Sequence, residues 1–159
     1  MLLLRESAGG LPRHVGNGID AHRSAETLVQ GREDPMTPIA KVLIVEDSRL
    51  FRHVFRQMLQ ARFPALEIHE AVDGKEALEI VKGAPPDLVF MDIQLPGVNG
   101  LEVMRMIKAQ HPQITGVIFT GYDAEYRDAA SKDADYFLSK RSTSEEVFSM
   151  IENILKAKV

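Results

Sequence analysis

Short runs of consecutive apolar residues, each followed by a segment with helical periodicity, constrain the fold of this chain more than any other feature. Residues 41–45 (KVLIV) and 87–91 (DLVFM) are almost entirely apolar, as in strands that are covered on both faces of a sheet. Residues 48–63 carry apolar side chains in steps of three and four, which is typical of an amphipathic helix. Because parallel strands need crossover connections, the alternation predicts a parallel sheet with helices on both faces.

The same alternation continues along the chain. Further strands are expected at residues 67–71, 116–120 and 134–138, and further helices at residues 74–83, 100–110 and 124–132 and after residue 143. Asp73 is placed to cap one of these helices, and either Ser142 with Glu145 or Thr143 with Glu146 offers a capping box to the last one. Five strands alternating with five helices predict a doubly wound α/β sandwich of three layers.

Residues 1–38 differ from the rest of the chain. They contain scattered Gly, Pro and charged residues without an apolar period, so they bury too little surface to offset the entropy of ordering. We therefore expect a disordered extension at residues 1–38 and a folded domain at residues 39–159. One hypothesis is that translation starts at Met36, which intact mass measurement of the native protein would decide.

Composition excludes several functional classes. The 159 residues include no cysteine and carry a formal net charge of −4, with a pI of about 5.7. The absence of cysteine excludes disulfides, thiolate metal sites and a Cys nucleophile, and the charge argues against a broad electrostatic contact with nucleic acid. The apolar run at residues 2–4 is too short for a signal peptide or membrane span. We expect a cytoplasmic protein that binds neither nucleic acid nor membrane.

Polar side chains follow four of the five predicted strands. Glu46 and Asp47 follow the first, Asp92 the third, Thr120 ends the fourth and Lys140 follows the fifth. Sites in open α/β sheets form beyond the carboxyl ends of the strands, so these side chains are expected to meet at one rim. Each alone has a plainer explanation, because an acid at a strand end usually caps a helix or lies in a solvated turn. Their occurrence together on one rim favours a site.

Three carboxylates held together repel one another, and their pKa values rise unless a cation is present. Mg²⁺ prefers oxygen ligands and typically takes one or two carboxylates together with phosphate oxygens. Asp92 lies between the acidic pair and a lysine, where its carboxylate is placed to attack phosphorus as a nucleophile. The ammonium of Lys140 and a hydroxyl donor are placed to stabilise the charge that develops on the phosphoryl oxygens.

At these residues the chain closely resembles the receiver domain of two-component response regulators, the chemotaxis-regulator-like superfamily. The resemblance covers about residues 39–157 and is most specific at residues 42–52 (VLIVEDSRLFR), 71–79 (AVDGKEALE) and 86–103 (PDLVFMDIQLPGVNGLEV). It implies a flavodoxin-like (βα)5 fold, whose five-stranded parallel sheet has the order 2-1-3-4-5.

The resemblance also implies roles for individual residues. Asp92 is the implied phosphoacceptor, and Asp47 and Asp92 are the implied direct ligands of Mg²⁺. Glu46 is implied to bind the ion through water, and the backbone carbonyl of Gln94 to supply another ligand.

Thr120 is implied to donate its hydroxyl to the phosphoryl group, and Lys140 to pair with another of its oxygens. Phe137 occupies the aromatic switch position, where the ring turns inward as Thr120 moves, although a plain core aromatic is the alternative. Such a movement remodels the face formed by the last two predicted helices and the last strand.

Two positions depart from the family pattern. Arg141 stands where a proline usually follows the lysine, often after a cis bond, whereas a cis bond before another residue costs about 2.5–4 kcal/mol. This favours a trans bond after Lys140 and leaves the isomer open. Asp133 stands where a glycine is common. If that turn needs a positive φ, Asp tolerates it better than most residues.

The leading interpretation is a single-domain response regulator that catalyses only its own phosphorylation and dephosphorylation and is not a conventional enzyme. A sensor histidine kinase or histidine phosphotransfer protein is the implied phosphodonor. Because only four residues, 156–159, follow the last predicted helix core, we expect no DNA-binding output domain. Output is then expected through a downstream protein or phosphoryl relay, from a monomer or a phosphorylation-dependent homodimer.

Three other functions are alternatives to this interpretation. An Asp-nucleophile phosphohydrolase needs a second acid two residues after the nucleophile, where this chain has Gln94. A flavin-binding module needs a loop that cradles phosphate, and the pair Glu46-Asp47 repels it. An adaptor that keeps the site but acts by binding alone remains, and equal partner affinity of the wild type and Asp92→Asn would distinguish it.

Overall fold

The computed structural model describes residues 40–121, 127, 128, 130 and 132–158. Nine helices and strands in this part have defined bounds. They are β1 (Ala40–Val45), α2 (Arg49–Arg62), β2 (Leu66–Ala71), α3 (Gly74–Gly83), β3 (Leu88–Met91), α4 (Gly100–Gln110), β4 (Thr115–Thr120), β5 (Tyr136–Ser139) and α6 (Ser144–Lys158). The expected extension at residues 1–38 and much of the expected helix at 124–132 lie outside the described residues. Within the described part, none of the helices combines the length and the apolar character needed to cross a membrane.

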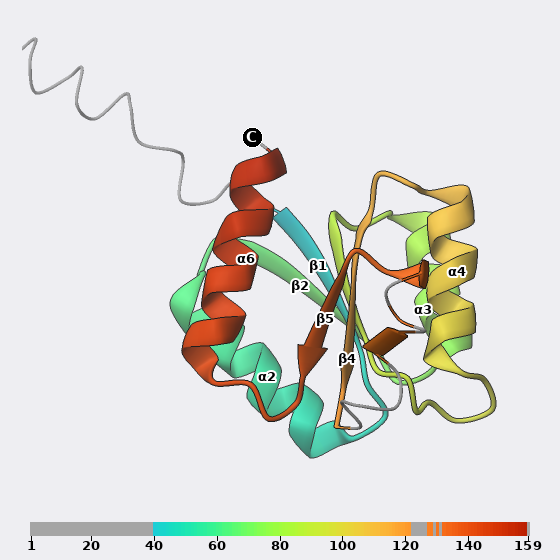
Figure 1. Cartoon of the computed structure of the whole chain (residues 1–159), viewed down its shortest axis with the longest axis horizontal. Helices are drawn as coiled ribbons and strands as arrows, with labels where there is room; N and C mark the ends of the chain where they lie inside the picture. The colour runs from blue at the N-terminus through green and yellow to red at the C-terminus, as the bar shows by residue number, and fades with distance from the viewer. Residues whose placement is uncertain (1–39, 122–126, 129, 131, 159) are drawn as a thin grey trace, which may run out of the picture. The chain divides into compact units, whose positions relative to one another are not determined.

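The five strands form one parallel sheet in the order β2-β1-β3-β4-β5. Helices α2 and α6 cover one face of this sheet, and α3 and α4 cover the other (Figure 1). The doubly wound α/β fold and the strand order expected from the sequence are therefore confirmed. All the parallel strands point the same way, so their carboxyl ends meet at one rim of the sheet.

The strands alternate their side chains between two apolar layers. In β1, Val42 and Ile44 lie in the layer beneath α2 and α6, and Leu43 and Val45 lie in the layer beneath α3 and α4. This is the period of two that a strand imposes. Because both faces are covered, the whole run from Val42 to Val45 is buried, which explains why the sequence reads as continuously apolar rather than alternating.

Side-chain caps set several helix boundaries. The side chains of Ser48, Asp73 and Asn99 accept hydrogen bonds from backbone N–H groups in the first turns of α2, α3 and α4, which satisfies donors without partners inside the helix. The predicted cap at Asp73 and the predicted bounds of α4 are confirmed. For α6, the Thr143 hydroxyl accepts from the Glu146 N–H at 3.2 Å, so Thr143 rather than Ser142 supplies the cap.

The start of β5 was predicted two residues too early. The Ala134 N–H donates to the Ala130 carbonyl at 2.9 Å, so this residue still continues the preceding helical hydrogen-bonding pattern. Residues 136–139 pair with β4 instead, with Thr120 opposite Ser139. Pairing, and not apolar character, thus sets the start of this strand.

The connection between β3 and α4 brings the start of α4 close to the backbone of Asp92. Gln94 and Asn99 form an isolated antiparallel bridge across it, and Gly97 turns the chain with φ of 81°. The Gly100 N–H donates to the Ile93 carbonyl at 2.8 Å. A Cβ on Gly100 would lie 1.9 Å from the backbone oxygen of Asp92, a distance that no side chain tolerates. Glycine is required at position 100 because the helix begins directly against Asp92, the residue that follows β3.

We predict that Gly100→Ala lowers the free energy of unfolding by about 1–3 kcal/mol or more, because the backbone must move to admit the methyl group. Gly83→Ala is the matched control. Position 83 ends α3 with open space around it and without a positive φ, so alanine there is expected to stabilise by about 0.4–1 kcal/mol. Urea denaturation of both variants measures the difference, and equal stabilities would contradict this account of the turn.

Candidate functional site

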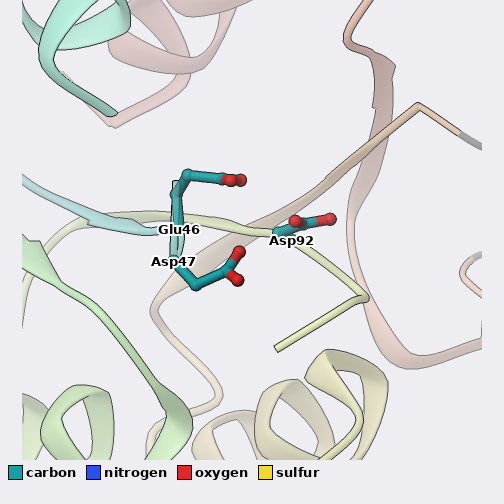
Figure 2. Close-up of side chains that lie close together, drawn as sticks. All are labelled: Glu46, Asp47 and Asp92. Carbon is teal, nitrogen blue, oxygen red and sulfur yellow. The ribbon is translucent and has the colours of Figure 1, made fainter. Parts of the chain in front are cut away.

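Three carboxylates meet at the carboxyl ends of β1 and β3. Glu46 and Asp47 directly follow β1, and Asp92 directly follows β3. One ligand oxygen from each lies within 4.8 Å of the others, and Figure 2 shows the three side chains close together, with those of Glu46 and Asp47 extending toward Asp92. The structure thus brings together the acidic residues that the sequence predicted to share a rim.

The sheet itself positions these acids. The Glu46 N–H donates to the Ala71 carbonyl at 3.0 Å, and the Asp92 N–H donates to the Val45 carbonyl at 3.1 Å. Both bonds continue the parallel ladder one residue beyond the strands. As a result, Glu46 and Asp92 are held with only 1% and 4% of their surface exposed, whereas Asp47 is exposed.

Lys140 is the cation that faces the acids. Its Nζ lies 2.8 Å from Glu46 Oε2 and 3.2 Å from Asp92 Oδ2. The Lys140 N–H donates to the Thr120 carbonyl at 2.9 Å, which extends the pairing of β4 with β5 to the rim. The ammonium also lies 4.6 Å from the centre of the Phe51 ring, within the range of a cation–π contact.

Burial and charge shift the pKa values of two groups in this cluster. Burial raises the pKa of Glu46, and the charge of Asp92 raises it further, against a hydrogen bond from Lys140 that lowers it. Burial lowers the pKa of Lys140, but its hydrogen bond to Glu46 and the charges of Asp92 and Glu46 outweigh burial and leave that pKa above its ordinary value. Lys140 therefore stays charged at neutral pH. Ionisation of Glu46 is disfavoured, because its carboxylate is buried and lies beside Asp92.

The donor set fits a hard divalent cation. Three carboxylate groups face one ammonium group, so the cluster carries an excess of negative charge once its acids are ionised. All the clustered ligand atoms are oxygens, which Mg²⁺ prefers. Asp47 is exposed, so the ion would keep contact with water, as Mg²⁺ usually does.

The other predicted site residues lie around this cluster. Thr120 is fully buried at the end of β4. Gln94 is exposed, and its N–H faces Asp92 Oδ1 at 3.4 Å. Phe137 is partly buried on β5, where its ring packs against the apolar layer beneath α3 and α4 and lies 5.4 Å from the guanidinium carbon of Arg127.

The structure shows the consequences of both departures from the family pattern. No peptide bond in the described part of the chain is cis, so the bond between Lys140 and Arg141 is trans. Asp133 accepts two hydrogen bonds from the Arg105 guanidinium, at 3.1 and 3.0 Å. An acid at position 133 thus ties the segment before β5 to α4, a pairing that local sequence does not reveal.

Sequence reasoning missed the contribution of Phe51. The apolar spacing of residues 48–63 indicates only that Phe51 belongs to a helix face, but its ring lies beneath the Lys140 ammonium and 5.1 Å from the Phe119 ring. An aromatic residue four positions after Asp47 was the only available signal, and it does not show which cation the ring will meet.

Comparison with known proteins identifies the family. The model of the response regulator receiver domain matches residues 42–152. The chain therefore belongs to the response regulator receiver domain family, and the strand order and acidic rim described above agree with this membership.

Several relatives share this domain. Over 109 residues, the chain is 36% identical to a protein-glutamate methylesterase/protein-glutamine glutaminase of Pyrococcus horikoshii, an alignment that covers 65% of this chain and 29% of that protein. Over 118 residues, it is 30% identical to the response regulator MprA of Mycolicibacterium vanbaalenii, covering 73% and 50%. The chain thus spans half or less of the length of these relatives.

Solved structures agree with the fold. The response regulator TrrA of Thermotoga maritima, in complex with Mg(2+)-BeF, matches with a TM-score of 0.66 and 30% identity, covering 72% of this chain and 97% of that one. A CheY-like receiver domain protein of Methanospirillum hungatei matches with a TM-score of 0.67 and 24% identity, covering 74% and 94%. The second likeness shows the fold alone.

We predict that Mg²⁺ raises the melting temperature more at neutral than at acid pH. Folding raises the pKa of Glu46, so protonated Glu46 favours the folded state. This contribution to the free energy of unfolding is complete below the ordinary pKa of glutamate and is lost as the pH rises through the raised pKa. Above that pH the ionised acids repel one another, and a bound cation relieves the repulsion.

Thermal unfolding with Mg²⁺ or EDTA across this pH range measures the effect. Asp47→Asn is the control, because it removes one oxygen anion from the exposed side of the cluster and should lose most of the Mg²⁺ response. A Mg²⁺-induced shift of equal size at acid and neutral pH would contradict the prediction.

Proposed function

We propose that this receiver domain is a phosphorylation switch whose phosphoacceptor is Asp92. The observation that carries the proposal is the geometry around one buried carboxylate. Asp92 lies within 4.8 Å of two further acids, and one of its oxygens is 3.2 Å from the Lys140 ammonium. Acidic metal ligands on one side and a fixed cation on the other are what phosphoryl transfer to a carboxylate requires.

In the proposed reaction, an Asp92 carboxylate oxygen forms a bond to phosphorus while the bond from phosphorus to the donor group breaks. The donor keeps the electron pair of that bond, and Asp92 becomes an acyl phosphate. Glu46, Asp47, Asp92 and the Gln94 carbonyl would hold Mg²⁺, which supplies positive charge to the phosphoryl oxygens when bound.

The residues of the chain have separate tasks in this scheme. The Lys140 ammonium exchanges a hydrogen bond to a carboxylate for one to a phosphoryl oxygen. It is placed to do so because it already lies beside Asp92. The Thr120 hydroxyl, at the adjacent strand end, donates to another oxygen. These donors stabilise the charge that spreads over the transferring group.

We propose that phosphorylation of Asp92 alters the surface of the domain by changing the packing of β5. Thr120 lies opposite Ser139, and Ile118 lies opposite Phe137 in the β4–β5 pairing. A shift of Thr120 toward a phosphoryl group changes the packing at the end of this strand pair, and the partly buried Phe137 ring is placed to respond. The altered surface would then bind a downstream protein or favour phosphoryl relay.

The proposed phosphodonor is a histidine kinase or a histidine phosphotransfer protein, with which receiver domains interact. The relatives include a methylesterase and the regulator MprA, so related receiver domains work within proteins of different outputs. The output proposed here, binding of a protein partner, rests on the position of Phe137 on β5, next to the strand that ends at Thr120, and not on those relatives.

We predict that acetyl phosphate with Mg²⁺ adds a single phosphoryl group to the wild-type chain. The same treatment should leave Asp92→Asn unmodified, because the amide is a poor nucleophile, and EDTA should abolish the adduct of the wild type. Intact mass spectrometry measures each result. An adduct of equal yield on Asp92→Asn would refute the assignment of Asp92, and a wild type that binds Mg²⁺ but takes no phosphoryl group would favour the adaptor alternative.

A further inference from the structure

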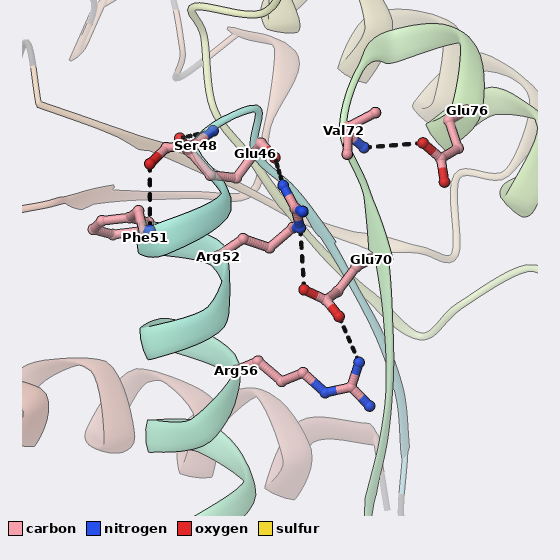
Figure 3. A network of polar contacts seen from close by, with 8 residues as sticks. All are labelled: Glu46, Ser48, Phe51, Arg52, Arg56, Glu70, Val72 and Glu76. Atoms are coloured by element: carbon pink, nitrogen blue, oxygen red, sulfur yellow. Dashed lines mark hydrogen bonds and ion pairs between the residues drawn. The ribbon is translucent and has the colours of Figure 1, made fainter.

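An arginine on α2 reaches the backbone of the acidic pair. Arg52 donates from Nη1 to the carbonyl oxygen of Glu46 at 2.7 Å and from Nε to Glu70 Oε1 at 3.1 Å. The Arg52 side chain is only 13% exposed. Figure 3 shows its guanidinium between the loop that follows β1 and the Glu70 side chain on β2.

Glu70 holds this guanidinium in place. Its second carboxylate oxygen accepts a hydrogen bond of 2.6 Å from Arg56 Nη1 (Figure 3). Glu70 therefore receives one charged donor on each oxygen. Because the guanidinium of arginine is planar and its donors are fixed relative to one another, the bond to Glu70 also sets the direction in which Nη1 of Arg52 points.

The atom that accepts the hydrogen bond from Arg52 Nη1 belongs to the backbone of the acidic pair. The Glu46 carbonyl belongs to the peptide group that joins Glu46 to Asp47, the two neighbouring acids of the cluster. The N–H of Glu46 is bound to Ala71, and its side-chain Oε1 accepts from the Ser48 N–H at 3.1 Å. With its carbonyl bound to Arg52, Glu46 is held at its N–H, its carbonyl and its side chain.

We infer that Arg52 is a positioning residue for the metal ligands. By holding the peptide group between Glu46 and Asp47, Arg52 keeps both carboxylates turned toward Asp92 before any ion arrives. Partners that orient ligating groups raise metal affinity because the site need not be rearranged on binding. This inference rests on the proposed function, since it concerns the Mg²⁺ that the same acids would hold.

Arg56 provides a matched control. It lies one turn further along α2 and shares Glu70, but its described bond goes to that carboxylate and not to the backbone of the acidic pair. Removing either arginine takes one charged donor from Glu70. Only removal of Arg52 also frees the Glu46 carbonyl, so a difference between the two variants reports that bond.

The experiment compares Arg52→Gln and Arg56→Gln by isothermal titration with MgCl₂ at constant pH and ionic strength. Arg52→Gln should bind Mg²⁺ about tenfold more weakly than the wild type, in line with the loss of other partners that orient metal ligands. Arg56→Gln should bind Mg²⁺ as the wild type does. With acetyl phosphate, Arg52→Gln should need correspondingly more Mg²⁺ for half-maximal phosphorylation, whereas its rate at saturating Mg²⁺ should stay near that of the wild type.

Equal Mg²⁺ affinity in the two variants would overturn the inference, because Arg52 would then act only through the Glu70 ion pair. If circular dichroism shows that Arg52→Gln does not fold, Arg52→Lys and Arg56→Lys replace the pair, since a single ammonium cannot reproduce the two-pronged contact of Arg52. A wild type that binds Mg²⁺ without accepting a phosphoryl group would refute the proposed function and leave the Arg52 comparison valid. A wild type that binds no Mg²⁺ would refute both.

Discussion

The electrostatic repulsion among Glu46, Asp47 and Asp92 is the constraint on which the rest of the site depends. The parallel ladder of β1 with its two neighbours extends one residue past the strands, and this extension forces two of the acids into a buried rim. Lys140 offsets part of the repulsion, but the pKa of Glu46 is still raised. Holding ionised acids at this buried rim therefore costs stability, and a bound cation would relieve the repulsion.

The same constraint connects the site to the surrounding structure. Lys140 must approach two carboxylates, and it does so with its backbone bound to Thr120 and its ammonium over the Phe51 ring. Glu46 is buried although its carboxylate is charged when ionised, and hydrogen bonds from its backbone to β2 and from α2 to its carbonyl hold it there. A group that enters between Lys140 and Asp92 therefore changes contacts that reach β4, β5 and α2 together.

Much of this was predictable from sequence, for identifiable physical reasons. Strands buried on both faces leave continuous apolar runs, so β1 and β3 were recognised, and the bounds of α4 follow from its glycine start and its apolar spacing. Because parallel strands end at one rim, Glu46, Asp47 and Asp92, which follow two of the strands, could be expected from the sequence to meet there. The strand order came from the family resemblance and not from the pattern itself.

Contacts between distant segments were not predictable in the same way. The start of β5 depends on which residues pair with β4, and the cap of α6 depends on a choice between Ser142 and Thr143 that the spacing leaves open. The pairs Arg105–Asp133 and Arg52–Glu70 join residues 28 and 18 positions apart. Neither shows a local sequence signal, because their geometry exists only once the elements have packed.

The most direct test of the central claim is to locate the phosphoryl group chemically. The wild-type chain, phosphorylated by acetyl phosphate with Mg²⁺, is reduced with sodium borohydride, which converts an aspartyl phosphate into homoserine, and its peptides are then sequenced by mass spectrometry. The account predicts homoserine at position 92 and at no other aspartate, with none formed when EDTA is present. Homoserine at Asp47 or elsewhere, with Asp92 intact, would contradict it.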